Sequence, residues 1–496
     1  MSLDLARLWE LEWPYLSLLG LALFSLIPAA FPARNRAKLT ALVAALGFLF
    51  CAQGFYQQAD LGVSAAFDLL VFDRFGNLLS SLMCLIGFVT VLISYAYWNS
   101  QAETIPEYYT LLLFTVFGMA TMVFTTQLLV FVLGLEIMSL SLYALVGFRR
   151  YDPRSGEAAF KYFLLGSVAT AFLLFGIAML YGATGTMDLA RLPETLRDPA
   201  LQPLYQLSAL LILLGFAFKV AAVPFHFWAP DAYDGAPMPV TGFMAAGVKV
   251  AAFGALLRVL QAWAPSLSLP WQKWIVMLSF ATMVIGNLVA LRQQHLKRLM
   301  AYSSIAHAGY ILLGFATLVS GGFRSEAISP ILTYLAVYSL MTLGVFAILT
   351  LLSSRGVEVN QLQDLDGLAD RHPALAAALS VFLISLAGVP PTAGFLAKYY
   401  LFSQAIEVGL FPLAIGGILV SAISLYYYLG PIVRMYFHHR EKTLEVPRVS
   451  PAFKLLLALL VIGVFYLGLF PGKMVELSRS AELFPAKSAP SGFSQK

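Results

Sequence analysis

The sequence predicts an all-α polytopic membrane protein of about 14 transmembrane helices, built around two inverted five-helix repeats with proline-broken helices. Of its 496 residues, 60% are hydrophobic and 11% are charged, whereas soluble chains are about 45–50% apolar and about 25% charged. The apolar residues lie in segments of about 20 residues, the length that crosses the hydrocarbon core of a bilayer. Basic residues are concentrated in alternate loops, which is typical of a multi-pass protein.

Hydrophobic segments of the right length follow one another through the chain. We expect helices near residues 14–33, 37–57, 72–98, 107–126, 128–148, 158–181, 203–222, 238–261, 271–291, 296–319, 328–352, 373–407, 411–437 and 451–470. The start MSLDLARLWELEWPY carries acids and has no cleavage site of small residues, so we expect the first segment to be retained as a helix.

Loop charge predicts the orientation of the chain. With the first loop on the cytoplasmic side, Arg and Lys fall mainly in every second loop, as they do in cytoplasmic loops. The loops at 99–107 and 223–237 are exceptions, being acidic. This pattern favours an inner-membrane protein with both termini on the periplasmic side.

Two proline breaks in hydrophobic segments suggest an internal duplication. Pro224 lies in the fourth helix of one set of five, and Pro390–Pro391 in the fourth helix of another; paired broken helices of this kind mark inverted-repeat transporters. We therefore divide the chain into an N-terminal region, a first repeat, a second repeat and a C-terminal helix with its tail: 1–106, 107–261, 271–437 and 438–496.

Ionisable side chains deep in the apolar segments cost about 2.5–3.5 kcal/mol each to insert, and four of them stand out, with a fifth that is shallower. They are Glu136, Lys219, Lys249, Lys398 and, closer to a helix end, Lys161. A lysine near a helix end can simply extend its amine to the interface, and this alternative remains open for Lys161. Glu136 could also be a structural partner of a lysine. For Lys219, Lys249 and Lys398 we favour a functional role, because they lie too far from their helix ends to reach the interface easily.

A row of such groups can carry protons. Burial lowers the pKa of any lysine and a neighbouring carboxylate raises it, so movement of one partner can switch the amine between charged and neutral. His307, in AYSSIAHAGY, adds a group that titrates near neutrality among polar neighbours, although a hydrogen-bonded core histidine is the alternative. His226, near Asp231 and Asp234, is expected to shape the mouth of a cavity rather than bind metal.

The prolines also leave backbone carbonyls without helical donors. Pro224 cannot donate to Val220, and Pro390 and Pro391 leave Leu386 and Ala387 unpartnered. Such backbone survives at membrane depth only where it lines protein or water. The breaks therefore indicate hydrated points beside Lys219 and Lys398, or else ordinary kinks.

Several classes of protein are excluded by what the sequence lacks. It contains no GxGxxG, P-loop or CxxC motif, and its two cysteines lie in or beside apolar segments. We therefore expect no metal and no cofactor in this chain, no nucleic-acid partner, and an energy source in another subunit or a counter-transported ion.

Four long stretches of this sequence resemble the antiporter-like proteins of respiratory complex I. They read VPFHFWAPDAYDGAPMPVTGFMAAGVKVAAFGALLR, LKRLMAYSSIAHAGY, SLAGVPPTAGFLAKYYLF and LGLEIMSLSLYALVGFRR. The similarity runs from about residue 100 to 437. Within this family the resemblance favours the subunit N branch. The sequence HFWAPDAY argues against subunits L and M and against Mrp-type sodium/proton antiporters. The end of the chain soon after the fourteenth span argues against subunit L, and Lys398 argues against subunit M.

The resemblance implies roles for individual residues. Glu136 matches the fifth-helix glutamate, Lys219 its seventh-helix partner, and Lys249 the eighth-helix connecting lysine. His307 matches the tenth-helix relay, Lys398 the twelfth-helix lysine, and Lys161 a sixth-helix lysine near the input side. The resemblance also implies partners in the membrane arm, including a neighbouring antiporter-like subunit, with FMN, iron–sulfur clusters and quinone in other subunits. An Mrp-type antiporter and a structural scaffold remain as alternatives.

Overall fold

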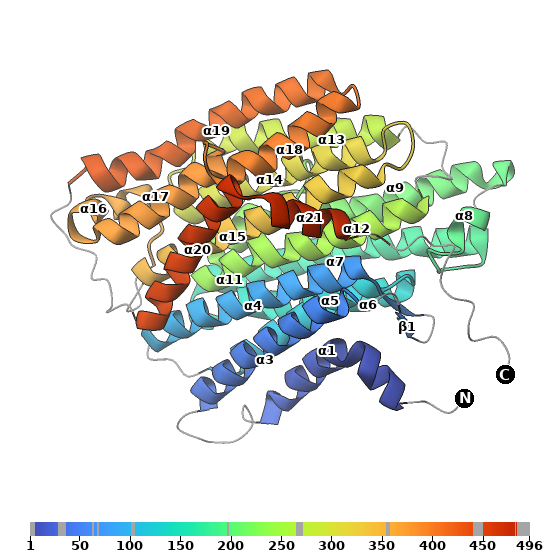
Figure 1. Cartoon of the computed structure of the whole chain (residues 1–496), viewed down its shortest axis with the longest axis horizontal. Coiled ribbons are helices and arrows are strands. Elements are labelled where there is room, and N and C mark those ends of the chain that lie inside the picture. Colours follow the sequence, from blue (N-terminus) through green and yellow to red (C-terminus); the bar gives the residue numbers. More distant parts are fainter. Residues whose placement is uncertain are drawn as a thin grey trace.

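The structure is a single bundle of long helices, most of which have roughly aligned axes and lie side by side (Figure 1). This computed structural model describes residues 5–27, 36–61, 64–66, 69–100, 105–195, 198–263, 271–353, 358–439, 450–481 and 483. Within these residues, 11 helices are long and apolar enough to cross a membrane. Three more segments, α1, α9 and the broken pair α17–α18, complete the fourteen that the sequence predicts.

The unbroken helices follow the predicted segments closely. They are α1 (Leu5–Phe24), α3 (Arg36–Gln58), α4 (Arg74–Ser100), α5 (Glu107–Phe124), α6 (Leu128–Val146), α7 (Pro153–Thr184), α13 (Trp271–Ala290), α14 (Leu296–Leu318), α15 (Ile328–Leu352), α19 (Phe411–Phe437) and α20 (Pro451–Leu469). The exception is α1, which was expected near 14–33 and instead begins at Leu5 and continues through Pro14. Its Leu, Ala, Arg and Glu residues are good helix formers, so the helix starts before the apolar run does.

Both predicted helix breaks are confirmed. In the first half, α9 (Gln202–Lys219) ends at Lys219 and is followed by the short α10 (Trp228–Gly235) and α11 (Met238–Phe243). A π-helical turn (Met244–Val248) then leads into α12 (Lys249–Trp263). In the second half, α17 (Pro373–Ala387) and α18 (Ala393–Glu407) flank the Pro390–Pro391 step.

At each break a side chain satisfies backbone near the interruption. The carbonyl of Ala387, one of those that the sequence predicts to be freed, accepts a hydrogen bond of 2.8 Å from Lys398 Nζ. In the first break, Trp228 Nε1 donates to the carbonyl of Phe218 at 2.8 Å. These bonds provide the partners that a buried carbonyl needs where no water is available.

Several short elements were not expected from the sequence. They are the antiparallel hairpin β1 (Ser64–Ala66) and β2 (Leu70–Phe72), the helices α8 (Leu192–Thr195), α16 (Leu368–Arg371) and α21 (Gly472–Ser480), and the π-helical turn before Lys249. Most are too short to give a periodic signal, and hydropathy windows the length of a span average over them.

Helix α6 packs closely on α5 because both helices carry glycine at the crossing. A Cβ atom on Gly118 would lie 2.6 Å from the carbonyl oxygen of Gly134, and one on Gly134 would lie 2.9 Å from that of Gly118. Small residues let helix backbones approach in this way in membranes. Glu136 follows Gly134 by two residues, so this contact fixes the segment that carries it.

A buried ion pair joins α12 to the start of α4. Arg258 makes two hydrogen bonds of 2.9 Å to the carboxylate of Asp73, and its Nε donates to the carbonyl of Val123 at 2.7 Å. The side chains of Arg258 and Asp73 are 5% and 1% exposed. The pair therefore ties the helix of Lys249 to α4 and α5.

We expect Asp73→Asn to destabilise the protein by about 3–5 kcal/mol, because it leaves the Arg258 guanidinium buried without a countercharge. Thermal unfolding of the purified protein in detergent measures the loss. The control is Asp60→Asn, which removes a 3.0 Å pair with Arg74 whose side chains are 67% and 37% exposed, and which is expected to cost about 0–1 kcal/mol. Equal losses in the two variants would contradict a stabilising role for the buried pair.

Candidate functional site

Lys219, at the end of α9, contacts α6 one turn after Glu136. Lys219 is the last residue of α9 and is 4% exposed. Its Nζ donates at 2.7 Å to the hydroxyl of Ser139, which lies one turn after Glu136. Glu136 accepts a 2.9 Å hydrogen bond from Thr170 on α7, and its charge acts on that of Lys219. The structure thus places the amine of Lys219 against α6, three residues along the helix from Glu136.

Aromatic and apolar residues surround the amine of Lys219. Its Nζ lies 5.8 Å from the ring centre of Tyr143 and 5.7 Å from that of Tyr162. A small cavity beside it is lined by Met122, Phe131, Leu135, Leu173, Gly215, Phe216 and Ala252. The rings can stabilise a cation without supplying a negative charge.

Lys249 lies at the centre of the bundle and is paired with neutral groups. It follows the π-helical turn directly and is 3% exposed. Its Nζ donates to the carbonyl of Ser304 and lies 5.2 Å from the ring centre of Tyr338. The hydroxyls of Tyr338 and Tyr233 both reach the Ser304 hydroxyl, at 3.0 and 3.3 Å. A π-turn displaces the residues that follow it, and such turns are frequent at functional sites.

His307 is hydrogen-bonded through both ring nitrogens. Nδ1 lies 2.6 Å from the hydroxyl of Tyr334, and Nε2 lies 3.1 Å from that of Tyr428. The hydroxyl of Tyr428 also contacts the hydroxyl of Ser303. Each hydroxyl can donate or accept, so the tautomer of His307 is free to change with them.

Lys398 occupies the second helix break. It is 5% exposed, and its Nζ donates at 2.8 Å to the carbonyl of Ala387 and at 2.8 Å to the hydroxyl of Ser421. The amine lies 5.1 Å from the ring centre of Tyr310. The hydroxyl of Tyr310 accepts from Asn287, whose Oδ1 accepts from Tyr427 at 3.0 Å.

Together these contacts form a polar row through an apolar bundle. Serine and tyrosine hydroxyls surround Lys249 and His307, and Tyr310 and Asn287 continue from there toward Lys398. Hydroxyl and imidazole groups can each give up one proton while taking another. The row is therefore suited to passing protons between lysines. The hydrogen-bond partners of these lysines are hydroxyl and carbonyl groups, which carry no charge.

Lys161 differs from the other predicted residues. Its side chain is 45% exposed and pairs with Glu157 at 2.6 Å and with Asp231 at 3.2 Å. His226, 7% exposed, and Asp231 flank the first break as predicted. Lys161 thus lies at the surface end of the structure around the break, apart from the buried row.

Part of this site was missed in the sequence. The site residues predicted from charge do not include six uncharged hydrogen-bonding groups: Tyr334, Tyr338, Tyr427, Tyr428, Asn287 and Ser421. Tyrosine is common in membrane proteins, so only the polar residues Asn287 and Ser421 within apolar helices gave a signal. Within the described ranges, no cluster of three or more His, Cys, Asp or Glu residues is placed to hold a metal ion.

Comparison with known proteins connects this geometry to a family. The sequence model described as NADH:quinone oxidoreductase/Mrp antiporter, TM, matches residues 125–424. The chain is 41% identical to NADH-quinone oxidoreductase subunit N of Trichlorobacter lovleyi, over 94% of this chain and 95% of the relative. It is 43% identical to subunit N 1 of Sorangium cellulosum, over 91% of each. A chain of respiratory complex I from Thermus thermophilus with bound aureothin superimposes with a TM-score of 0.79 at 33% identity, over 94% of this chain and 99% of that one.

We expect Tyr428→Phe to destabilise the protein by about 1–3 kcal/mol, because it removes the hydroxyl shared by His307 and Ser303 and leaves both buried groups short of a partner. The matched control on the same helix is Tyr426→Phe, at a side chain that is 74% exposed, with an expected change within about 0.5 kcal/mol. Thermal unfolding in detergent compares the two. Similar stability of both variants would show that the Tyr428 hydroxyl is not a needed partner.

Proposed function

The chain belongs to the NADH:quinone oxidoreductase/Mrp antiporter family, and from this premise we propose that it is a proton-translocating membrane-arm subunit of respiratory complex I, of the subunit N type. It is thus a multi-pass membrane component of a translocase. The observation that carries the proposal is the buried polar row, in which Lys219, Lys249 and Lys398 are each at most 5% exposed. Charged residues at such depth are costly and mark ion pathways.

The chain contributes proton transfer, while the oxidation of NADH and the reduction of quinone belong to other subunits of the complex. The cofactors FMN and iron–sulfur clusters are expected there, and another antiporter-like subunit is expected beside this one in the arm. We also propose that the chain lies in a bacterial inner membrane with both termini on the periplasmic side, as its loop charges favour.

In the proposed pathway, Lys219 is the residue of the first repeat (107–261) whose amine alternates between protonated and neutral. Glu136 favours the protonated amine while the two are close, and separating them favours release of a proton to the interior of the row. Ser139 accepts from the amine at 2.7 Å and can hold it in place as Glu136 moves. Lys161 at the surface would supply protons to this half.

Lys249 and His307 connect the first half to the second. The hydroxyls of Tyr338 and Ser304 lie between them, with Tyr428 on the far side of the imidazole. Lys398 is the terminal group of the second half. Its partners are a carbonyl, a hydroxyl and an aromatic ring, so the amine can lose its proton without leaving a carboxylate unpaired.

The two breaks fit a division into repeats at 107–261 and 271–437. Each places a lysine beside interrupted backbone, where helix segments can shift more easily than in a continuous helix. Charge movement begun by quinone reduction elsewhere would reach this chain as a displacement of Glu136 or of the segment around Lys219.

We expect Lys219→Ala in the intact complex to lower NADH-driven proton pumping by at least about tenfold, because a positioned proton-transfer group contributes about 10²–10⁴-fold. The membrane arm should remain assembled. Proton uptake and NADH oxidation are measured in the same vesicles. Lys454→Ala, at an exposed lysine on α20, is the control and should pump normally.

The alternatives predict different results. An unchanged proton-to-electron ratio in Lys219→Ala would contradict the pumping role and favour a scaffold. The isolated chain in liposomes should show little sodium-driven proton flux, and strong flux would instead favour an Mrp-type antiporter.

A further inference from the structure

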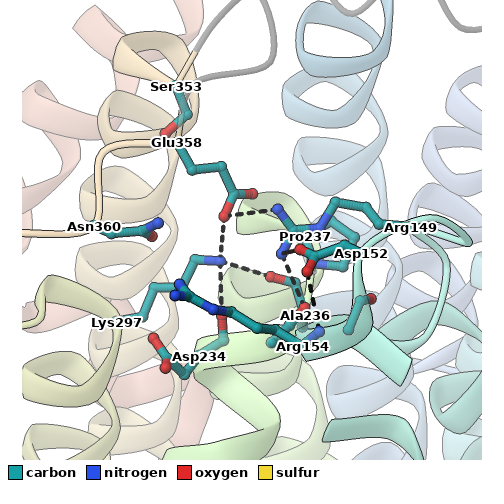
Figure 2. A network of polar contacts seen from close by, with 12 residues as sticks. Arg149, Asp152, Arg154, Asp234, Ala236, Pro237, Lys297, Ser353, Glu358 and Asn360 are labelled. Atoms are coloured by element: carbon teal, nitrogen blue, oxygen red, sulfur yellow. Dashed lines mark hydrogen bonds and ion pairs between the residues drawn. The ribbon is translucent and has the colours of Figure 1, made fainter. Parts of the chain in front are cut away.

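A cluster of charges lies around Glu358, in the connection between α15 and α16, and none of the roles above uses it. Oε2 of Glu358 lies 2.6 Å from Lys297 Nζ and 3.0 Å from Arg149 Nη1, and its Oε1 accepts from Tyr97 at 2.8 Å. Figure 2 shows the carboxylate between the two cations, which come from α14 and from the segment after α6. The side chains of Lys297 and Glu358 are 0% and 5% exposed, so this is a buried cluster.

The same two cations hold the end of α10. Lys297 Nζ donates to the carbonyls of Asp234 and Ala236 at 3.1 and 2.8 Å, and Arg149 Nη2 donates to that of Gly235 at 3.0 Å (Figure 2). These are carbonyls at a helix C-terminus, which have no helical donors and lie at the negative end of the helix dipole. Lys297 and Arg149 thus form a cationic cap on α10.

Glu358 makes this cap possible electrostatically. The fully buried Lys297 and the partly exposed Arg149, 22% exposed, repel one another, and breaking a buried ion pair typically destabilises strongly. Burial by itself raises the pKa of Glu358, but the charges of Lys297 and Arg149 outweigh it and hold that pKa below its ordinary value. The carboxylate therefore stays ionised and acts as a fixed countercharge, unlike a relay group, which must take up and release protons.

Helix α10 connects the two lysines of the first half. Its first residue, Trp228, binds the carbonyl of Phe218 next to Lys219 and stacks on Tyr162 at 4.6 Å between ring centres. Tyr233 reaches the Ser304 hydroxyl, and the carbonyl of Ser304 holds Lys249. A shift of the C-terminal end of α10 would therefore be felt at both lysines.

We propose that Glu358 is a positioning residue: through Lys297 and Arg149 it clamps the C-terminus of α10 and so sets the geometry between Lys219 and Lys249. The clamp joins parts of the chain far apart in sequence, from α4, α6 and α10 in the first half to α14 and the 358–360 segment in the second. The consequence for pumping rests on the proposed function, whereas the clamp itself does not.

The first test measures the clamp directly, by hydrogen exchange in the intact complex. In Glu358→Gln, amides of residues 228–236 should exchange at least about tenfold faster than in the unmodified complex, because the cap loses its countercharge. Glu358→Asp should restore part of the protection, since a carboxylate is again present. Unchanged exchange in Glu358→Gln would overturn the proposal.

A matched control removes another carboxylate from the same connection. Asp366 pairs with Arg434 at 3.2 Å, and the side chains are 15% and 24% exposed. We expect Asp366→Asn to leave exchange in residues 228–236 unchanged. Equal acceleration by Asp366→Asn and Glu358→Gln would also overturn the proposal, since it would show general loosening of this face.

The second test asks whether the clamp matters for proton transfer. Glu358→Gln should lower the proton-to-electron ratio by about threefold or more, with Glu358→Asp closer to normal and the arm assembled in both. Faster exchange with a normal ratio would overturn the link between the clamp and the lysines. If Lys219→Ala pumps normally while Glu358→Gln still loosens α10, the proposed function fails and the clamp stands.

The clamp should also have a defined pH dependence. Because the folded state lowers the pKa of Glu358, the stabilisation is fully present above the ordinary carboxyl value of about 4.3 and is lost as the pH falls through the lowered value. Tyr97, Arg149 and Lys297 contact the carboxylate directly, with Asp152, Asp234 and His295 behind them. Glu358→Gln keeps all of these neighbouring groups and is therefore the reference.

We therefore expect protection factors for residues 228–236 to stay constant from pH 8 to about pH 5 and to fall only below that, in the unmodified complex alone. An equal loss of protection with falling pH in the unmodified complex and in Glu358→Gln would assign the effect to another group and overturn the role of Glu358.

Discussion

The interrupted helices of this bundle leave buried carbonyls that take partners from elsewhere in the chain, and this constraint organises the structure around the breaks. Lipid offers no hydrogen bonds, so a carbonyl released by a helix break must be satisfied by another part of the chain. At the second break the partner of Ala387 is Lys398. At the end of α10 the partners are Lys297 and Arg149. Interrupted backbone and buried cations thus stabilise one another, and each explains why the other can lie so deep.

The buried cations fall into two kinds according to their partners. Arg258 is held by the carboxylate of Asp73 in a two-bonded pair, and Lys297 by that of Glu358. Such pairs fix helices in place. Lys249 and Lys398 are instead held by carbonyls, hydroxyls and aromatic rings, so no countercharge is left unpaired when a proton leaves. The ion-paired cations hold the helices together, and the lysines with neutral partners are chemically able to take part in proton transfer.

The short α10 connects the ion-paired Lys297 to the surroundings of Lys219 and Lys249. One end contacts the backbone beside Lys219, and the other is capped by the cations that Glu358 balances. A charge outside the polar row can therefore affect the row without donating or accepting a proton in it. This arrangement suits a protein that must couple a displacement at its periphery to proton transfer in its interior.

The sequence by itself determined the class of fold, the fourteen segments, the two breaks and the buried lysines Lys219, Lys249 and Lys398. These follow from local properties: a span needs about 20 apolar residues, proline removes a donor, and an ionisable group within such a span is conspicuous at once. The roles drawn from these residues remain proposals.

Only the tertiary structure decided which groups are partners. The tyrosines around His307 come from α15 and α19, and Glu358 meets Lys297 and Arg149 from distant parts of the chain. Such contacts depend on how helices pack, and local sequence does not encode that. The structure also placed Lys161 at the surface and introduced the π-turn before Lys249. Lys219, Lys249 and Lys398 were visible in the sequence as buried charges. The burial of Arg258, Lys297 and Glu358, and the partners of all these groups, became visible only when the helices were assembled.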